Sequence, residues 1–153
     1  MTLYHVSPAN LAIGTELQPG RFGNFYRQYR AGGPMPTPEN ISNLLWEICF
    51  EAVRQAVAPT KPSRLDCVFA AESLEMAKRF RDKYRGGCGT ILKVETLNTN
   101  MPCHRGDFSF MSTNFDGPYI EHMSRGAVRY WTEEPKDIVE LLYPCPLRVV
   151  GAV

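Results

Sequence analysis

One carboxylate in this sequence lies where an acid is unexpected. Glu140 interrupts the apolar run Ile138-Val139-Glu140-Leu141-Leu142, which has the length and composition of a strand. Successive side chains of a strand point to opposite faces, so if Val139 and Leu141 pack inward, Glu140 faces either water or a cleft. In a cleft it would offer a carboxylate that binds a hydroxyl group or accepts a proton. In water it would be an ordinary surface acid.

Histidine is the other residue type with catalytic potential. His5 lies in the β-rich run Leu3-Tyr4-His5-Val6-Ser7, which continues into turn residues at Pro8-Ala9-Asn10. From this stretch alone, His5 is either a packed residue or a ligand. Cys103 precedes His104, but no further ligands follow at short spacing, so we expect no metal site. No Gly-x-Ser-x-Gly motif occurs, and no Ser-His-Asp order has supporting context.

The composition is that of an ordinary globular protein. The chain has 153 residues, of which 44% are hydrophobic and 22% charged, and its net charge is +1. We therefore expect one soluble domain over residues 1–153, without a global field that attracts nucleic acid or an anionic membrane. No apolar run approaches the ~20 residues of a transmembrane helix, and the first strand begins too near Met1 for a signal peptide. The five widely spaced cysteines favour reduced thiols and a cytoplasmic location.

The hydrophobic pattern predicts an α+β fold. We expect strands over residues 2–6, 65–70, 90–95, 138–143 and 147–150. We expect three helices, one starting at Pro38, one capped by Ser73, and one starting near Asp116-Gly117-Pro118. The apolar stripe expected to face the core from the first helix is Ile41, Leu44, Leu45, Ile48 and Ala52. The order of elements favours a mixed or mainly antiparallel sheet with helices packed on it.

Two long segments carry too many helix and strand breakers for regular structure. Residues 17–38 interleave glycines and prolines with arginines and aromatic residues, which predicts a functional lid or a mobile segment. Residues 96–117 are also expected to be irregular. Gly86-Gly87-Cys88-Gly89 is interpreted as a turn and not as a phosphate loop, because no helix follows it. The basic second helix is either a solvated face or a surface for phosphate or nucleic acid.

Both ends of the chain resemble one enzyme superfamily. Tyr4-His5 with Asn10-Leu11-Ala12-Ile13-Gly14, and the final run Pro146-Leu147-Arg148-Val149-Val150-Gly151, resemble rifampicin ADP-ribosyltransferases. Arg64-Leu65-Asp66-Cys67-Val68-Phe69-Ala70 resembles the second motif of the ADP-ribosyltransferase superfamily. Glu140-Leu141-Leu142 resembles the acidic strand of its DNA-targeting toxins. The chain as a whole is similar to an uncharacterised bacterial branch of the same superfamily.

The resemblance implies a split α+β fold in which two small sheets, with helices packed on them, enclose a cleft for NAD. By this resemblance His5 would bond the adenosine-side ribose, and the Val6 backbone would hold the nicotinamide amide. Val68 stands where the family has a stacking tyrosine, so Phe69, Tyr26 or Tyr29 would supply the aromatic ring. Arg21, Arg27 and Arg30 of the lid would reach the pyrophosphate. The remaining residues expected to line the NAD site are Tyr4, Ser7, Asn10, Phe22 and Arg64.

The resemblance leaves two candidates for the catalytic acid. Glu140 corresponds to the toxin glutamate, and Asp107 is its rival because rifampicin-modifying enzymes carry an aspartate upstream of the final strand. We favour Glu140, which would bond the nicotinamide ribose and stabilise the oxocarbenium-like transition state. The expected function is an NAD-dependent ADP-ribosyltransferase whose acceptor is a protein, a nucleic acid or a small molecule such as an antibiotic. The alternatives are a non-catalytic NAD-, nucleotide- or nucleic-acid-binding module on the same fold, and an NAD glycohydrolase, in which water replaces the acceptor.

Overall fold

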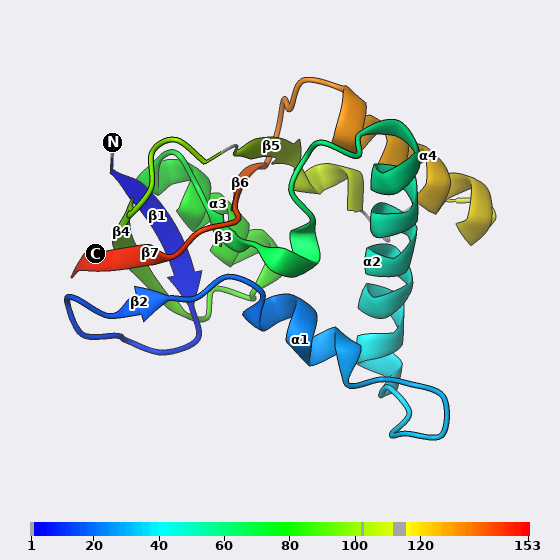
Figure 1. Ribbon diagram of the computed structural model, residues 1–153, viewed down its shortest axis with the longest axis horizontal. Helices are drawn as coiled ribbons and strands as arrows, with labels where there is room; N and C mark the ends of the chain where they lie inside the picture. Colours follow the sequence, from blue (N-terminus) through cyan, green and yellow to red (C-terminus); the bar gives the residue numbers. More distant parts are fainter. Residues whose placement is uncertain (1, 102, 112–115) are drawn as a thin grey trace.

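The computed structural model describes residues 2–101, 103–111 and 116–153. Two small sheets lie on one side of the molecule, and the long helices α2 and α4 lie on the other (Figure 1). The strands are β1 (Leu3–Ser7), β2 (Glu16–Leu17), β3 (Val68–Ala70), β4 (Thr90–Thr96), β5 (His104–Asp107), β6 (Val139–Tyr143) and β7 (Leu147–Ala152). The helices are α1 (Arg21–Arg27), α2 (Pro38–Val57), α3 (Leu74–Tyr84) and α4 (Tyr119–Thr132), with short 3-10 helices η1 (Arg64–Asp66) and η2 (Phe108–Met111).

Both sheets are antiparallel, so the α+β prediction with mainly antiparallel strands is confirmed. One sheet has the order β1-β4-β7-β2 and the other the order β3-β6-β5. An isolated bridge between Tyr4 and Ala71 connects them, with N–H···O distances of 2.9 and 2.7 Å. The edge strands β1 and β3 therefore meet at one point, next to His5 and Phe69.

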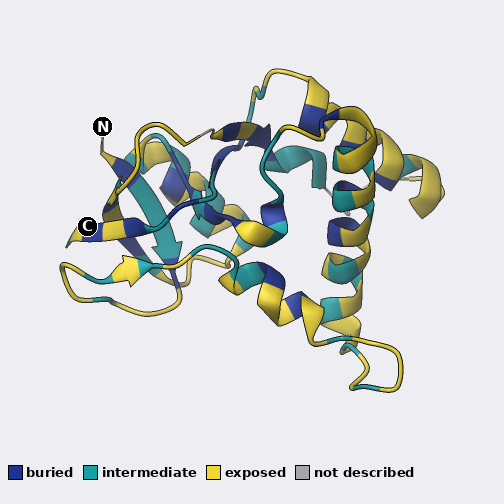
Figure 2. Ribbon diagram, in the orientation of Figure 1, coloured by how far each residue is buried: buried dark blue, intermediate teal, exposed yellow. Residues whose placement is uncertain are grey.

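Strand β6 lies between two hydrophobic cores. Leu142 packs with Trp46 and Phe50 of α2 and with aromatic residues of α4. Leu141 points to the other face and packs with β1, β4 and β7. Figure 2 shows dark, buried residues along β6 and on the face of α2 turned toward the sheets. Because both faces of β6 are covered, its sequence is apolar almost throughout.

The prolines after β6 move the chain from one sheet to the other. Pro144-Cys145-Pro146 separates β6, which belongs to the three-stranded sheet, from β7, which belongs to the four-stranded one. Proline fixes the backbone and lacks a ladder donor, so it suits this corner. The chain therefore turns here between its two final strands.

The prediction that residues 17–38 lack regular structure is wrong. The segment contains the end of β2 and the whole of α1. A Cβ at Gly23 would lie 2.0 Å from the Leu65 carbonyl oxygen, so only glycine lets α1 pack directly on η1. Arg27 at the end of α1 also pairs with Asp66 of η1, with an N···O distance of 2.7 Å. This short helix is stabilised by tertiary contacts, which the local sequence pattern does not reveal.

Two other segments also differ from prediction. Residues 96–117 contain β5, which pairs with β6, and η2. The expected strand over residues 65–70 is shorter, because η1 occupies residues 64–66 before β3 begins. In both places tertiary pairing, rather than local propensity, decides the structure.

The predicted core stripe of α2 is also wrong. Trp46, Glu47 and Phe50 are the residues that α2 buries. By contrast, Ile41, Leu45 and Ile48 are 43%, 49% and 57% exposed. The two large aromatic side chains decide which face of the helix packs, because they bury more apolar area than the aliphatic stripe. None of the helices in the described residues is long and apolar enough to cross a membrane.

Candidate functional site

A buried cluster of charged side chains lies between the sheets and the helices. Arg64, at the start of η1, donates from Nε and Nη2 to the Glu47 carboxylate of α2 at 3.1–3.2 Å. Its Nη1 donates to the hydroxyl oxygen of Tyr130 at 2.8 Å and pairs with Glu140 of β6. The Tyr130 hydroxyl in turn donates to Glu140 Oε1 at 2.6 Å. Arg64 and Glu47 are 2% exposed and Glu140 is 6% exposed, so Glu140 does not face water, and it lines neither of the two pockets described below.

Sequence features explain how this ion cluster of Glu47, Arg64, Tyr130 and Glu140 forms. Gly106 lies opposite Glu140 on β5, and a Cβ there would lie 2.2 Å from the Tyr130 ring. Glycine at this position therefore lets Tyr130 approach the sheet and direct its hydroxyl at Glu140. Alternation along β6 places Glu140 on the same face as Leu142, toward the helices.

Burial and neighbouring charges have opposite effects on the pKa values of Arg64 and Tyr130. Burial disfavours the charged form of Arg64, but the Glu47 carboxylate and Tyr130 outweigh it and raise the pKa of the guanidinium. Burial raises the pKa of Tyr130, so its hydroxyl keeps the proton that it donates to Glu140. The cluster is a fixed set of charges in a nonpolar environment, where electrostatic interactions are strong.

Partly exposed aromatic rings lie over Arg64. The guanidinium carbon is 4.9 Å from the centroid of Phe69 and 5.9 Å from that of Phe108. Phe22 of α1 contacts Phe69 at 5.1 Å and Tyr26 at 5.0 Å between centroids. Phe22, Phe69 and Phe108 are only partly buried, whereas Phe50 on the other side of Arg64 is fully buried. Phe69 and Phe108 are therefore partly exposed rings beside Arg64, and Phe22 reaches Arg64 only through Phe69.

His5 contacts the same group of residues through Phe69. Its Nδ1 lies 2.7 Å from the Phe69 carbonyl oxygen, so Nδ1 carries a proton and donates it. Burial lowers the pKa of His5, and the positive charges of Arg85 and Arg21 lower it further, against the opposing effect of the Phe69 bond. His5 is thus neutral at pH 7, and Nε2 is its acceptor atom. His5 and Glu140 do not touch each other; Phe69 and Arg64 connect them.

A pocket of about 290 Å³ lies at the end of β1, next in sequence to His5, which does not line it. Val6, Ser7 and Pro8 line it together with Arg85, Cys88 and Gly89. Gly89 has φ +107°, and a Cβ there would lie 2.8 Å from the Ser7 carbonyl oxygen, so the turn at the mouth requires glycine. Two residues expected to bind NAD, Val6 and Ser7, therefore line one cavity with a basic side chain.

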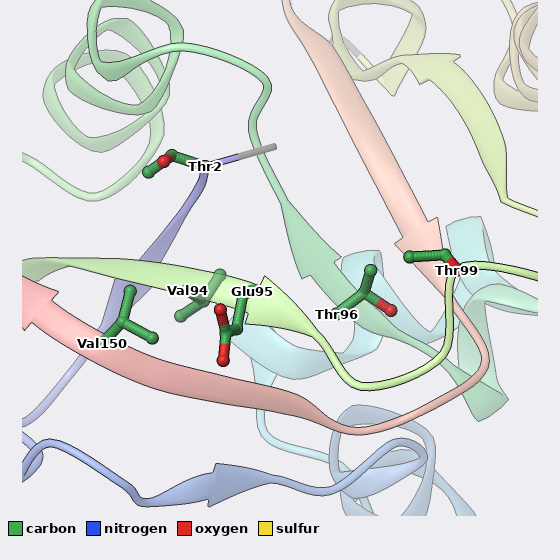
Figure 3. A pocket seen from close by; sticks show the side chains of 6 residues that line it. All are labelled: Thr2, Val94, Glu95, Thr96, Thr99 and Val150. Atoms are coloured by element: carbon green, nitrogen blue, oxygen red, sulfur yellow. The ribbon is translucent and has the colours of Figure 1, made fainter.

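A second pocket of about 300 Å³ contains none of the predicted site residues. It lies over the four-stranded sheet and is lined by Thr2, Val94, Glu95, Thr96, Thr99 and Val150 (Figure 3). Its polar groups are hydroxyls and one carboxylate, without a cation or a histidine. The cavity at the end of β1 is therefore the better candidate for an anionic ligand.

Asp107, the rival acid, contacts main-chain groups. Its carboxylate accepts N–H bonds from Ser109, Lys136, Asp137 and Ile138 at 2.8–3.2 Å. Burial would raise its pKa, but a hydrogen bond from the Ser109 side chain and these main-chain bonds outweigh burial and lower the pKa to about 2. The Asp107 side chain fixes residues 136–138, which lead into β6, so these contacts give Asp107 a structural role.

The other predicted residues lie outside these contacts. Tyr4 packs with Ala71 and its neighbours, and Asn10 is exposed in the loop after β1. Glu47 and Tyr130 were not predicted as site residues, and neither was Arg85. The pattern Trp46-Glu47 with Phe50 on α2 was the available signal for Glu47, because it places an acid beside two aromatic residues on one helical face. Within residues 2–101, 103–111 and 116–153, no three His, Cys, Asp or Glu side chains form a group that could hold a metal ion.

Comparison with known proteins gives a family but no activity. No curated protein matches the chain. One family model matches residues 24–153, which include part of α1, all the later helices and all strands except β1 and β2. Its description is "Protein of unknown function (DUF2441)". The match covers most of the sequence, and the chain therefore belongs to the DUF2441 family.

Proposed function

We propose that this protein is an NAD-dependent ADP-ribosyltransferase, which transfers ADP-ribose from NAD to an acceptor and releases nicotinamide. The observation that carries the proposal is a continuous set of contacts from His5 through Phe69 and Arg64 to Glu140. These residues come from both sheets and from η1, and the bridge between β1 and β3 brings them together. Four of the residues expected to form the site thus occupy one region.

His5 and the adjacent pocket would hold the dinucleotide. The neutral imidazole offers Nε2 to a ribose hydroxyl, and Val6 offers its backbone to the nicotinamide amide. Arg85 in the pocket and Arg21 at the start of α1 both act electrostatically on His5, so a diphosphate bound near His5 would gain two cations. An anionic ligand is therefore favoured at this end of β1.

The aromatic rings over Arg64 would hold the nicotinamide. Phe69 takes the position next to that of the family tyrosine, Phe22 contacts it, and Phe108 lies near the same Arg64 guanidinium. A flat aromatic ligand stacks on such rings. Because Glu140 is 6% exposed, the side chains around it must move to admit the ribose.

Glu140 would act on the ribose that carries the nicotinamide. The bond between C1′ of this ribose and the nicotinamide nitrogen breaks, and nicotinamide leaves with the electron pair. The acceptor nucleophile forms the new bond to C1′ and loses its proton. A fixed carboxylate stabilises the positive charge that develops on the ribose, and losing one such group costs about 10²–10³ in rate. The described contacts of Glu140 use Oε1, and we assign Oε2 to the ribose 2′-hydroxyl.

The burial of Glu140 also favours one alternative, a non-catalytic module that binds NAD or a related nucleotide. A carboxylate that is paired with a buried arginine contributes to structure even without chemistry. Such a module would bind the dinucleotide at His5 and leave it intact. Release of nicotinamide distinguishes the two functions, because only the enzyme breaks the bond to C1′.

The test is transfer of label from adenine-labelled NAD in a cell lysate supplied with the purified protein. We expect label on one class of acceptor (protein, nucleic acid or small molecule), together with free nicotinamide. Glu140→Gln should lower the rate about 10²–10³-fold, while Asp107→Asn, corrected for its folded fraction, should keep near-normal turnover. Absence of label and of nicotinamide with the folded wild-type protein would overturn the proposal. Loss of turnover in the Asp107 variant alone would reassign the acid.

A further inference from the structure

We infer that Glu47 and Arg64 are positioning residues for Glu140, and that the negative charge of Glu47 keeps Glu140 effective toward a cation. This inference rests on the proposed function. Glu47 is 2% exposed and binds Arg64, which in turn pairs with Glu140.

The hydrogen-bond pattern shows how Glu47 fixes the guanidinium. Glu47 accepts from both Nε and Nη2 of Arg64, which locks the plane of the group. Only Nη1 is then directed at Tyr130 and Glu140. Arg64 therefore holds one oxygen of the Glu140 carboxylate in place, together with the Tyr130 hydroxyl.

The charges of the cluster lead to the same conclusion. Arg64 carries one positive charge and faces two carboxylates, so the ionised cluster has a net charge of −1. With Arg64 and Glu140 alone, the net charge would be zero, and an oxocarbenium-like group would gain little from Glu140. Glu47 balances Arg64, so Glu140 keeps its attraction for the developing positive charge.

Three buried titratable groups near the cluster, His104, Cys67 and Tyr130, carry no charge at pH 7, although the charged Lys61 acts on His104. Burial and the charge of Lys61 lower the pKa of His104, two residues from Gly106 on β5, to about 4. Burial raises the pKa of Cys67, just before β3, to about 12. Tyr130 keeps its proton because burial raises its pKa. Glu47 is thus the carboxylate that balances the positive charge of Arg64 and leaves the charge of Glu140 uncompensated.

The test compares Glu47→Gln with Glu47→Asp and with Glu51→Gln in the nicotinamide-release assay. Glutamine keeps the size of Glu47 but removes its charge, whereas aspartate keeps the charge. Glu51 lies one turn further along α2 and binds Arg54 and Ser63, so its substitution controls for a structural loss that does not involve Arg64. We expect Glu47→Gln to lower kcat about tenfold or more, the effect of one charge a few ångströms away in a partly shielded site. KM for NAD should stay within about twofold, since Glu47 itself would not contact NAD.

Two results separate this inference from the proposed function. If wild-type protein releases no nicotinamide, the proposed function fails and the inference falls with it. If wild type is active but Glu47→Gln and Glu51→Gln both lose activity only in proportion to their unfolded fraction, the inference alone is overturned. Recovery of most of the kcat in Glu47→Asp, together with an unchanged Kd for NAD by calorimetry, supports the charge argument. Equal losses of kcat in the Asp and Gln variants would contradict it.

Discussion

Replacing Asp107 by asparagine separates a structural acid from a catalytic one. Each oxygen of this carboxylate accepts two main-chain N–H bonds, Oδ1 from Ser109 and Ile138 and Oδ2 from Lys136 and Asp137. Asparagine turns one oxygen into a donor, so two N–H groups lose their acceptor. A hydrogen bond to a charged group contributes about 1.5–3 kcal/mol, and we expect Asp107→Asn to lower the free energy of unfolding by about 3 kcal/mol.

The effect should depend on pH with a defined sign. The pKa of Asp107 is lowered from 3.8 to about 2 in the folded protein. A lowered carboxyl pKa stabilises the fold above pH 4, and this stabilisation is lost as the pH falls through 2. A shift of nearly two units corresponds to about 2 kcal/mol. The difference in stability between wild type and Asp107→Asn should therefore shrink as the pH falls from 5 to 2.

The assay is urea unfolding followed by the fluorescence of the two tryptophans, both of which are buried. Asp82→Asn is the matched control, because Asp82 is an exposed aspartate of α3 that pairs with Arg81. Its substitution should change stability by less than about 0.5 kcal/mol. A similarly small effect for Asp107→Asn, or a difference that does not change with pH, would refute the structural role of Asp107.

Three further predictions follow from the site. Gly106→Ala should lower the free energy of unfolding by about 1–3 kcal/mol in urea titrations, because the added Cβ would overlap the Tyr130 ring. Gly151→Ala is the control and should change the stability little, since the atom nearest to its Cβ is 3.7 Å away. Equal effects of the two substitutions would contradict the close approach of Gly106 to Tyr130. Arg85→Gln should raise the Kd for NAD about tenfold in calorimetry and reduce the salt dependence of binding. Arg148→Gln at β7 is the control and should leave the Kd unchanged. An unchanged Kd in the Arg85 variant would show that Arg85 does not bind the diphosphate. Residues 17–38 should gain hydrogen-exchange protection on adding NAD, and unchanged exchange at saturating NAD would rule out the lid role.

Strong local patterns made part of the fold predictable. Ser73 caps α3 as expected, with its hydroxyl accepting from the Met76 N–H, and α2 starts at Pro38 after Thr37. Alternation in β6 correctly separated Glu140 from Leu141. These features depend on neighbours within a few residues, which the sequence displays directly.

The parts that were missed depend on distant contacts. β5 is four residues long and has no apolar alternation; its pairing with β6 makes it a strand. α1 depends on the approach of Gly23 to η1. The partner of Glu140 could not be read from the sequence either, because Arg64 and Glu47 come from separate elements that meet only in the folded core. The sequence indicated an acid of interest, but not that the fold would bury it against an arginine.

Calorimetric titration of the protein with NAD tests the central claim most directly, since binding needs no acceptor. The account predicts saturable binding at one site, a Kd that rises about tenfold or more in His5→Ala, and near-normal binding by Glu140→Gln. His122→Ala, at a histidine of α4 that contacts Trp46, which is not one of the proposed NAD-binding residues, should bind like wild type. No binding heat and no chemical-shift change at millimolar NAD with the folded wild-type protein would contradict the account.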